Sequence, residues 1–105
     1  MSSFAQRLAA CKKHGELTIS DLAHWFARPV CTVRTWLPEH GGRDPHGPAG
    51  RLAQEWLTRL ELCIKRKRGF PVPASLSWHN RPTYIREQRD DAGRNVGVPR
   101  VRATG

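Results

Sequence analysis

The feature that most constrains the fold is a run of helix-start and helix-stop signals between Leu17 and Pro38, in the stretch LTISDLAHWFARPVCTVRTWLP. Thr18 is followed three residues later by Asp21, which is the spacing of a capping box at a helix start. Pro29 suits the first turn of a second helix, because the N–H that proline lacks would have no intrahelical partner there. Pro38 ends that helix. The stretch therefore predicts two short helices separated by a tight break.

Apolar residues at helical spacing predict further helices on both sides of this stretch. The first covers about residues 3–14 and stops before Gly15, a common residue at helix ends. Residues 38–50 hold four glycines and three prolines and are expected to be a loop. The longest helix covers about residues 51–68, and a last helix is expected at about 83–92, with a proline in its first turn. No segment reads as a strand, so the sequence predicts a small all-α fold of four to five helices.

We expect these helices to form one domain, because a chain of 105 residues suits a single unit with a modest core. Residues 3–37 are expected to form a three-helix unit, with the 51–68 helix packed across it. From Gly93 onward the sequence is basic and poor in apolar residues. The expected division is a helical domain of residues 1–92 and a basic, flexible, disordered tail of residues 93–105. The residues expected to face the core are Leu22, Ala23, Phe26, Val30, Val33, Trp36, Leu37, Leu52, Trp56, Leu60 and Cys63.

The charge of the chain narrows the class of partner. Eighteen lysines and arginines stand against nine acids, which gives a formal net charge of +9. Such an excess on a small surface attracts polyanions, and nucleic acid is favoured over an anionic membrane. The first residues contain no long apolar run, so neither a signal peptide nor a transmembrane helix is expected. Three widely spaced cysteines do not indicate a disulfide framework. We expect a cytoplasmic protein without membrane contact.

Patterns for catalysis or metal binding are incomplete in this sequence. Cys11 and His14 have the spacing of a metal-binding pair, but no second pair completes four ligands. His79 and Asn80 resemble a fragment of a nuclease metal site, yet no second histidine or placed carboxylate accompanies them. The glycine-rich segment after Pro38 lacks the lysine and hydroxyl end of a nucleotide-binding loop. The sequence therefore predicts no catalytic residue, no metal site and no cofactor.

Residues 19–38 resemble the helix-turn-helix of DNA-binding regulators. That motif requires a small residue where its two helices cross, and Ala23 stands at this position. Val33 and Trp36 occupy the two apolar positions of the second helix. The turn departs from the usual pattern, with Ala27 in place of glycine and Arg28 in place of an aliphatic residue.

The segment FARPVCTVRTWL also resembles short helix-turn-helix proteins encoded by bacteriophages. These include phage regulators and the DNA-binding domains of small terminase subunits. The resemblance implies that the second helix lies in the major groove of double-stranded DNA, with its outward side chains toward the bases.

The outward side chains of this second helix are the first candidates for contact with DNA. Arg34 is the leading candidate for reading a base, because arginine can donate paired hydrogen bonds to guanine. The four adjacent cations at 65–68 could form a solvated helix end, but we favour contact with phosphates. Arg43 lies in the 38–50 loop, which could be a wing on the DNA or a plain connector. The candidate DNA-binding residues are Arg28, Cys31, Thr32, Arg34, Thr35, Arg43, Lys65, Arg66, Lys67 and Arg68.

Three classes of function remain open from the sequence. We favour a phage-type transcriptional regulator that binds a short duplex site as a symmetric dimer, because one helix-turn-helix reads one half-site. The alternative is a small terminase-like DNA-packaging subunit, which would recognise viral DNA as an oligomeric ring. The third class is an enzyme or a helical interaction module, in which the two capped helices are an ordinary hairpin. A phage-encoded protein would act in the cytoplasm of a bacterial host cell.

Overall fold

The computed structural model describes residues 3–95, and this part of the chain is helical, without β-strands. The predicted all-α class is therefore confirmed for the described residues. Among them, no helix is both long enough and apolar enough to cross a membrane. The elements in chain order are α1 (Phe4–His14), α2 (Ile19–Phe26), α3 (Val30–Trp36), the 3-10 helix η1 (Pro38–His40), α4 (Gly47–Lys65) and α5 (Arg81–Asn95).

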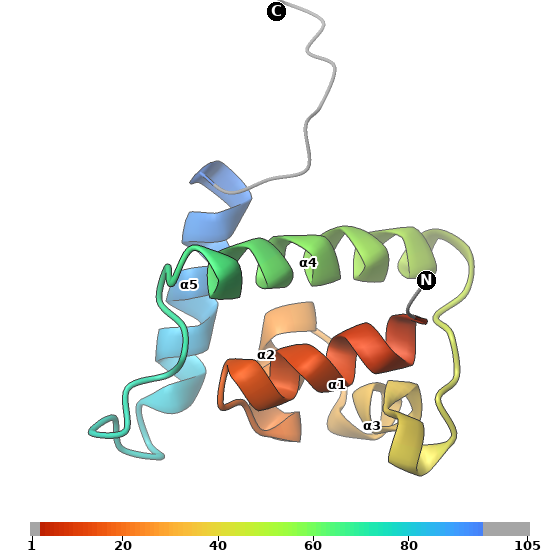
Figure 1. The fold of residues 1–105 in the computed structure, drawn as a ribbon, viewed down its shortest axis with the longest axis horizontal. Coiled ribbons are helices and arrows are strands. Elements are labelled where there is room, and N and C mark those ends of the chain that lie inside the picture. The colour runs from red at the N-terminus through yellow and green to blue at the C-terminus, as the bar shows by residue number, and fades with distance from the viewer. Residues whose placement is uncertain (1–2, 96–105) are drawn as a thin grey trace, which may run out of the picture.

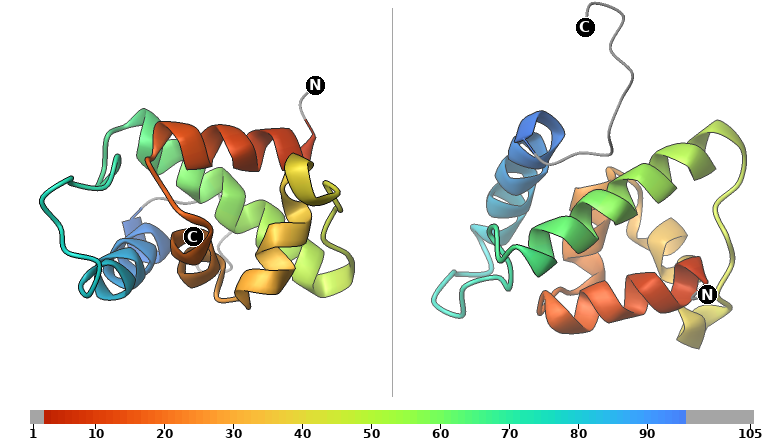
Figure 2. Two further views of the ribbon diagram at one scale, coloured as in Figure 1. Left: turned by 90° about the horizontal axis from the view of Figure 1, so that it is seen from below. Right: turned by 45° about the horizontal axis from the view of Figure 1, so that its top comes forward.

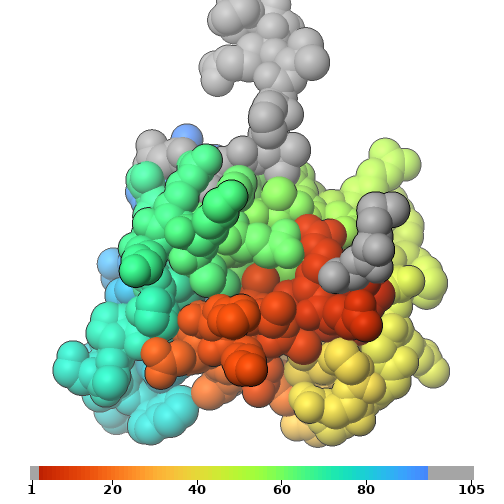
Figure 3. All heavy atoms as spheres, in the orientation of Figure 1, coloured from red at the N-terminus to blue at the C-terminus, as the bar shows by residue number. Residues whose placement is uncertain are grey.

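The long helix α4 is the element around which the others are arranged (Figure 1). Helix α1 packs along α4, and together they cover one face of the molecule (Figure 3). Helix α2 packs against α3, α4 and α5, and α5 crosses one end of α4 (Figures 1 and 2). The two ends of α4 lie at opposite sides of the molecule, the first on the side from which the chain arrives from η1 and the second near α5.

Two capping boxes define where the first helices begin. The Thr18 hydroxyl accepts a hydrogen bond from the backbone N–H of Asp21 at 3.0 Å, and the Asp21 carboxylate accepts one from the backbone N–H of Thr18 at 2.9 Å. Ser3 and Gln6 make the same reciprocal pair at the start of α1. These bonds satisfy backbone donors that have no partner within a helix. The predicted start of the second helix is confirmed.

Helix α4 covers Gly47–Lys65 rather than residues 51–68, and this corrects the prediction at both ends. It starts earlier because Pro48 lies in its first turn, where a proline favours helix initiation. It ends earlier because Lys67 adopts a left-handed conformation with φ +54°. Residues 38–50 are consequently not a continuous loop, since η1 occupies their beginning and α4 their end.

Helix α5 covers Arg81–Asn95 and so extends beyond the predicted range of residues 83–92. Ala92 is fully buried, and the backbone at Gly93 lies close to the Trp56 ring. This packing continues the helix into the first residues of the predicted tail. The rest of that tail, residues 96–105, lies outside the described residues.

The core between α1, α2 and α3 is built on three aromatic rings. Phe4 and Phe26 each lie edge-on to Trp36, with ring centroids 5.5 and 5.4 Å from that of Trp36. The two phenylalanine rings are tilted against one another, with centroids 6.4 Å apart. Val33 and Leu37 are completely buried beside them. Leu22 and Ala23 are buried as well, so the predicted inward positions of α2 and most of those of α3 are confirmed.

A second aromatic group joins α2 to α4 and to the segment that follows α4. Trp25 is 1% exposed and lies edge-on to Trp56 and to Phe70, with centroids 5.6 and 5.7 Å apart. Its indole N–H donates to the Trp56 carbonyl at 2.9 Å, which satisfies the polar atom of a buried ring. Trp78, by contrast, is 73% exposed.

Two residues expected in the core lie at the surface instead. Val30 is 38% exposed and Leu52 is 51% exposed. Val30 belongs to the first turn of α3, where α5 stands across a groove and does not cover it. Leu52 lies near the start of α4 and lines a hollow next to the α2–α3 turn. Helical spacing placed both on an apolar stripe, but no neighbouring element covers them.

Candidate nucleic-acid interface

The connection between α2 and α3 is a short turn with a defined backbone geometry. Ala27 adopts a left-handed conformation, φ +55° and ψ +47°, and the N–H of Arg28 donates to the carbonyl of Ala23 at 3.0 Å. This is the hydrogen bond of a Schellman motif, which commonly has glycine at the left-handed position. Ala27 therefore adopts the conformation for which glycine is usually selected. Pro29 is the N-cap residue of α3, so the helix begins two residues after Arg28.

Helix α3 has a buried side and an exposed side. Val33 is completely buried and Trp36 is 6% exposed, whereas Cys31 and Arg34 are exposed. Two threonines flank the exposed side and are half-buried. The hydroxyl of Thr35 donates to the carbonyl one turn earlier at 2.7 Å, so its oxygen retains acceptor capacity. The candidate DNA-binding residues of this helix, Cys31, Thr32, Arg34 and Thr35, are therefore exposed or half-buried, and Arg28 in the preceding turn is exposed.

The loop after η1 returns to the end of α3. The backbone N–H of Arg43 donates to the carbonyl of Thr35 at 2.8 Å, and that of Gly42 donates to the carbonyl of Leu37 at 2.9 Å. The Arg43 side chain is exposed. The structure therefore brings Arg43 to the same end of the molecule as α3, on a connector that leads directly into α4.

The cations at 65–68 form the end of α4 rather than an extension of the α3 surface. The N–H of Arg68 donates to the carbonyl of Cys63 at 2.8 Å, closing a second Schellman motif around the left-handed Lys67. The Arg68 guanidinium pairs with the carboxylate of Asp91 on α5 at 2.8 Å, and this hydrogen bond holds the pKa of Arg68 above its ordinary value. All four side chains are exposed, at the end of α4 opposite to η1 and α3 (Figure 1). The predicted site residues thus fall into two separate groups.

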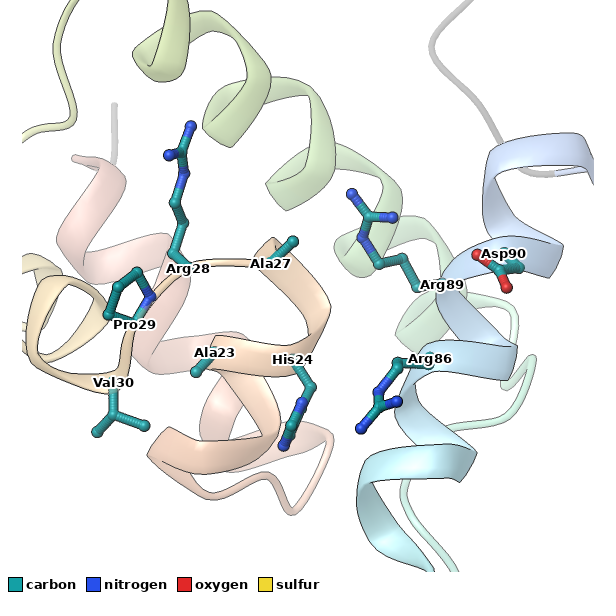
Figure 4. A pocket seen from close by; sticks show the side chains of 9 residues that line it. All are labelled: Ala23, His24, Ala27, Arg28, Pro29, Val30, Arg86, Arg89 and Asp90. Atoms are coloured by element: carbon teal, nitrogen blue, oxygen red, sulfur yellow. The ribbon is translucent and has the colours of Figure 1, made fainter.

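A groove of about 550 Å³ separates the α2–α3 turn from α5 (Figure 4). It brings Arg86 and Arg89 of α5 near His24 and the α2–α3 turn, although the sequence predicts no functional residue in the last helix. Residues three apart on a helix share a face, so the spacing of the two α5 arginines was a usable signal. The residues that line the groove are Ala23, His24, Ala27, Arg28, Pro29, Val30, Arg86, Arg89 and Asp90.

Two arginines of α5, Arg81 and Arg89, contact residues distant in the sequence and hold the helix in place. The Arg89 Nε donates to the carbonyl of Trp25 at 2.7 Å, and its guanidinium carbon lies 4.1 Å from the centre of the Trp56 ring. At the start of α5, the Arg81 Nε donates to the carboxylate of Asp21 at 3.2 Å. Asp21 is 3% exposed, so it is a buried charge paired with an arginine and bonded to the α2 cap.

The three cysteines are free, and they differ in exposure. Cys11 and Cys63 are buried, and burial raises the pKa of both thiols, that of Cys11 to about 12. Both therefore remain protonated near neutral pH. Cys31 is exposed on α3, where it is one of the candidate DNA-binding residues.

Comparisons of the chain with protein-family models, with curated proteins and with solved structures found no match. Inferences about function therefore come from the residues and geometry of this chain. Exposed basic side chains lie on the turn before α3 (Arg28), on α3 (Arg34) and on α5 (Arg86).

Proposed function

We propose that the protein binds double-stranded DNA sequence-specifically through a helix-turn-helix formed by α2 and α3, and that it acts as a phage-type transcriptional regulator. The observation that carries this proposal is the combination of a left-handed turn at Ala27 with an α3 that buries Val33 and exposes Arg34. An ordinary helical hairpin in a bundle requires only that one side of its second helix is buried. A reading helix also requires polar side chains on the outer side, at a turn tight enough to present them.

The dimensions of α3 fit the role of a reading helix. An α-helix with its side chains is about 10 to 12 Å in diameter, which fits a major groove about 12 Å wide. The seven residues of α3 extend about 10 Å along its axis. Arg34 lies near the middle of the exposed side and would donate to the edge of a guanine. Arg28 and Arg43 lie at the two ends of α3, where they would contact phosphates on either side of the groove.

The expected assembly is a symmetric dimer, because a single α3 covers only one half-site. Light scattering on the full chain measures this directly. A dimer supports the role of a transcriptional regulator. A ring of many subunits would instead support the alternative role, a small terminase-like DNA-packaging subunit.

The decisive experiment is selection from a pool of random duplexes, followed by sequencing of the retained DNA. We expect enrichment of short sites that contain a guanine at a fixed position, in two copies related by symmetry. Retention without any enriched site would reduce the activity to non-specific binding. Failure to retain duplex at low salt would overturn the proposal.

A further inference from the structure

We propose that the groove between the α2–α3 turn and α5 is a second DNA-binding site, which holds the sugar–phosphate backbone beside the base pairs that α3 reads. The proposal rests on the proposed function and adds α5 to the interface, with Arg86 as its principal phosphate contact.

The charge of the groove favours an anion. Three arginines and one aspartate line it, and Figure 4 shows Arg86 and His24 directed toward one another across the gap. Asp90 lies on the side of α5 away from His24. Within residues 3–95, neither Arg28 nor Arg86 is part of an ion pair. In Figure 4 the Arg28 guanidinium extends toward α4, whereas that of Arg86 projects into the gap. Arg86 is therefore available there to a phosphate oxygen, which a guanidinium matches in geometry and charge.

The floor of the groove favours a sugar–phosphate chain over a free anion. Ala23, Ala27 and Pro29 are small or flat, and Val30 is 38% exposed without a covering element. Such a floor permits close approach of a backbone, and deoxyribose carbons would cover the Val30 methyl groups. An apolar floor with a guanidinium rim thus complements alternating sugars and phosphates.

The groove is continuous with the exposed side of α3. Val30 lines the groove and lies one helical turn before Arg34, so both side chains project from neighbouring positions on one helix face. A strand held in the groove would therefore run directly beside the bases within reach of Arg34.

The position of α5 is determined before any ligand binds. Arg89 is held between the Trp25 carbonyl and the Trp56 ring, and Arg81 is held by Asp21. Arg86 lies between these two anchors on the same helix. Because α5 is fixed at both places, little ordering of the chain would oppose phosphate binding, which is the benefit of preorganisation.

The test is a salt titration of binding to a random-sequence duplex, with full-length Arg86→Gln compared to the wild type. Loss of one phosphate contact should reduce the log–log slope by about 0.9 and weaken random and selected duplexes by the same factor. Arg86→Lys, which keeps the charge, should retain most of the slope. Arg86 is exposed, so the thermal unfolding of both variants should match that of the wild type.

The matched control is Lys13→Gln, which removes the same charge from an exposed side chain in the last turn of α1, outside the candidate DNA-binding residues. We expect it to leave the slope unchanged. If Arg86→Gln leaves the slope at its wild-type value, or if the two glutamine variants reduce it equally, the groove is not a phosphate site and the inference is overturned. Duplex binding by the wild type in those cases would leave the proposed function standing, whereas absence of wild-type binding would remove the proposed function itself.

Inorganic phosphate is the second probe, because it carries the same chemistry without the sugars. Added at constant ionic strength, it should compete with duplex no better than sulfate does. Strong competition by phosphate that disappears in Arg86→Gln, with an unchanged duplex slope, would assign the groove to a free anion and would also overturn the inference.

Discussion

Helices α2 and α4 end in the same backbone geometry, yet the arginines that follow them have different surroundings. Each helix closes with a left-handed residue that is not glycine, Ala27 at φ +55° and Lys67 at φ +54°. In each case the next residue is an arginine whose N–H returns to a carbonyl five residues earlier. Arg68 pairs with Asp91, whereas Arg28 is exposed and lies outside the ion pairs of the described residues.

The difference comes from the segment that follows each turn. After Ala27, Pro29 starts α3 at once, and the basic surface stays open toward the groove. After Lys67 the chain reaches α5, which returns an acidic side chain to the same helix end. A dense run of cations in the sequence is therefore partly neutralised, while a surface assembled from α2, α3 and α5 keeps its charge.

The largest expected effect concerns the aromatic rings packed under α3. Trp36→Ala should lower the free energy of unfolding by about 3 to 5 kcal/mol, because the ring is buried against Phe4 and Phe26. Chemical denaturation measures the change. Trp78→Ala is the control, and at 73% exposure it should cost less than about 1 kcal/mol. Similar losses in both variants would contradict the described core.

The next effect concerns the Asp21–Arg81 pair that anchors α5. Helix α5 forms one side of the groove that Arg28 lines and supplies Asp91, the partner of Arg68. Asp21→Asn should lower stability by about 2 to 3 kcal/mol, because it removes charge-assisted hydrogen bonds from a buried pair. Thr18→Ala removes a capping hydroxyl but keeps the ion pair, and should cost about 1 kcal/mol. Equal costs would mean that Arg81 contributes nothing to the attachment of α5.

A smaller effect should distinguish the exposed side of α3 from the cations at the end of α4 in DNA binding. Arg34→Ala should relax the preference at one or two base pairs by about 1 to 3 kcal/mol, while affinity for random duplex changes little. Competition between selected and altered duplexes gives this difference. Arg68→Ala should leave the preference intact, because Arg68 lies at the other end of α4 and is paired with Asp91. An equal loss for all duplexes would show that Arg34 contacts only the backbone.

The smallest effect tests the shared turn geometry and has the opposite sign. Ala27→Gly should raise stability by about 0.5 to 1 kcal/mol, since relief of a left-handed alanine, about 1 to 2 kcal/mol, exceeds the entropy that glycine adds to the unfolded chain. Lys67→Gly should behave similarly. Ala23→Gly, inside α2, should instead destabilise. A loss of stability in Ala27→Gly would contradict the left-handed turn.

Short-range signals were sufficient to locate much of the α2–α3 segment and its two sides. The Thr18–Asp21 box forms within one turn, and Pro29 acts on the residues directly beside it. Burial of Val33 and Trp36 follows from their spacing. These features depend on atoms within about four residues along the chain, so the amino-acid order specifies them without knowledge of the fold.

Long-range packing determined which side chains remain available. Arg68 meets Asp91 across 23 positions and Arg81 meets Asp21 across 60, and neither partner could be inferred from local spacing. The same packing left Val30 exposed, extended α5 to Asn95 and placed Arg86 beside the α2–α3 turn. The apolar pattern of a helix predicts which residues share a face. Which face packs against another element, and which charged side chains that element brings, depends on how the whole chain packs.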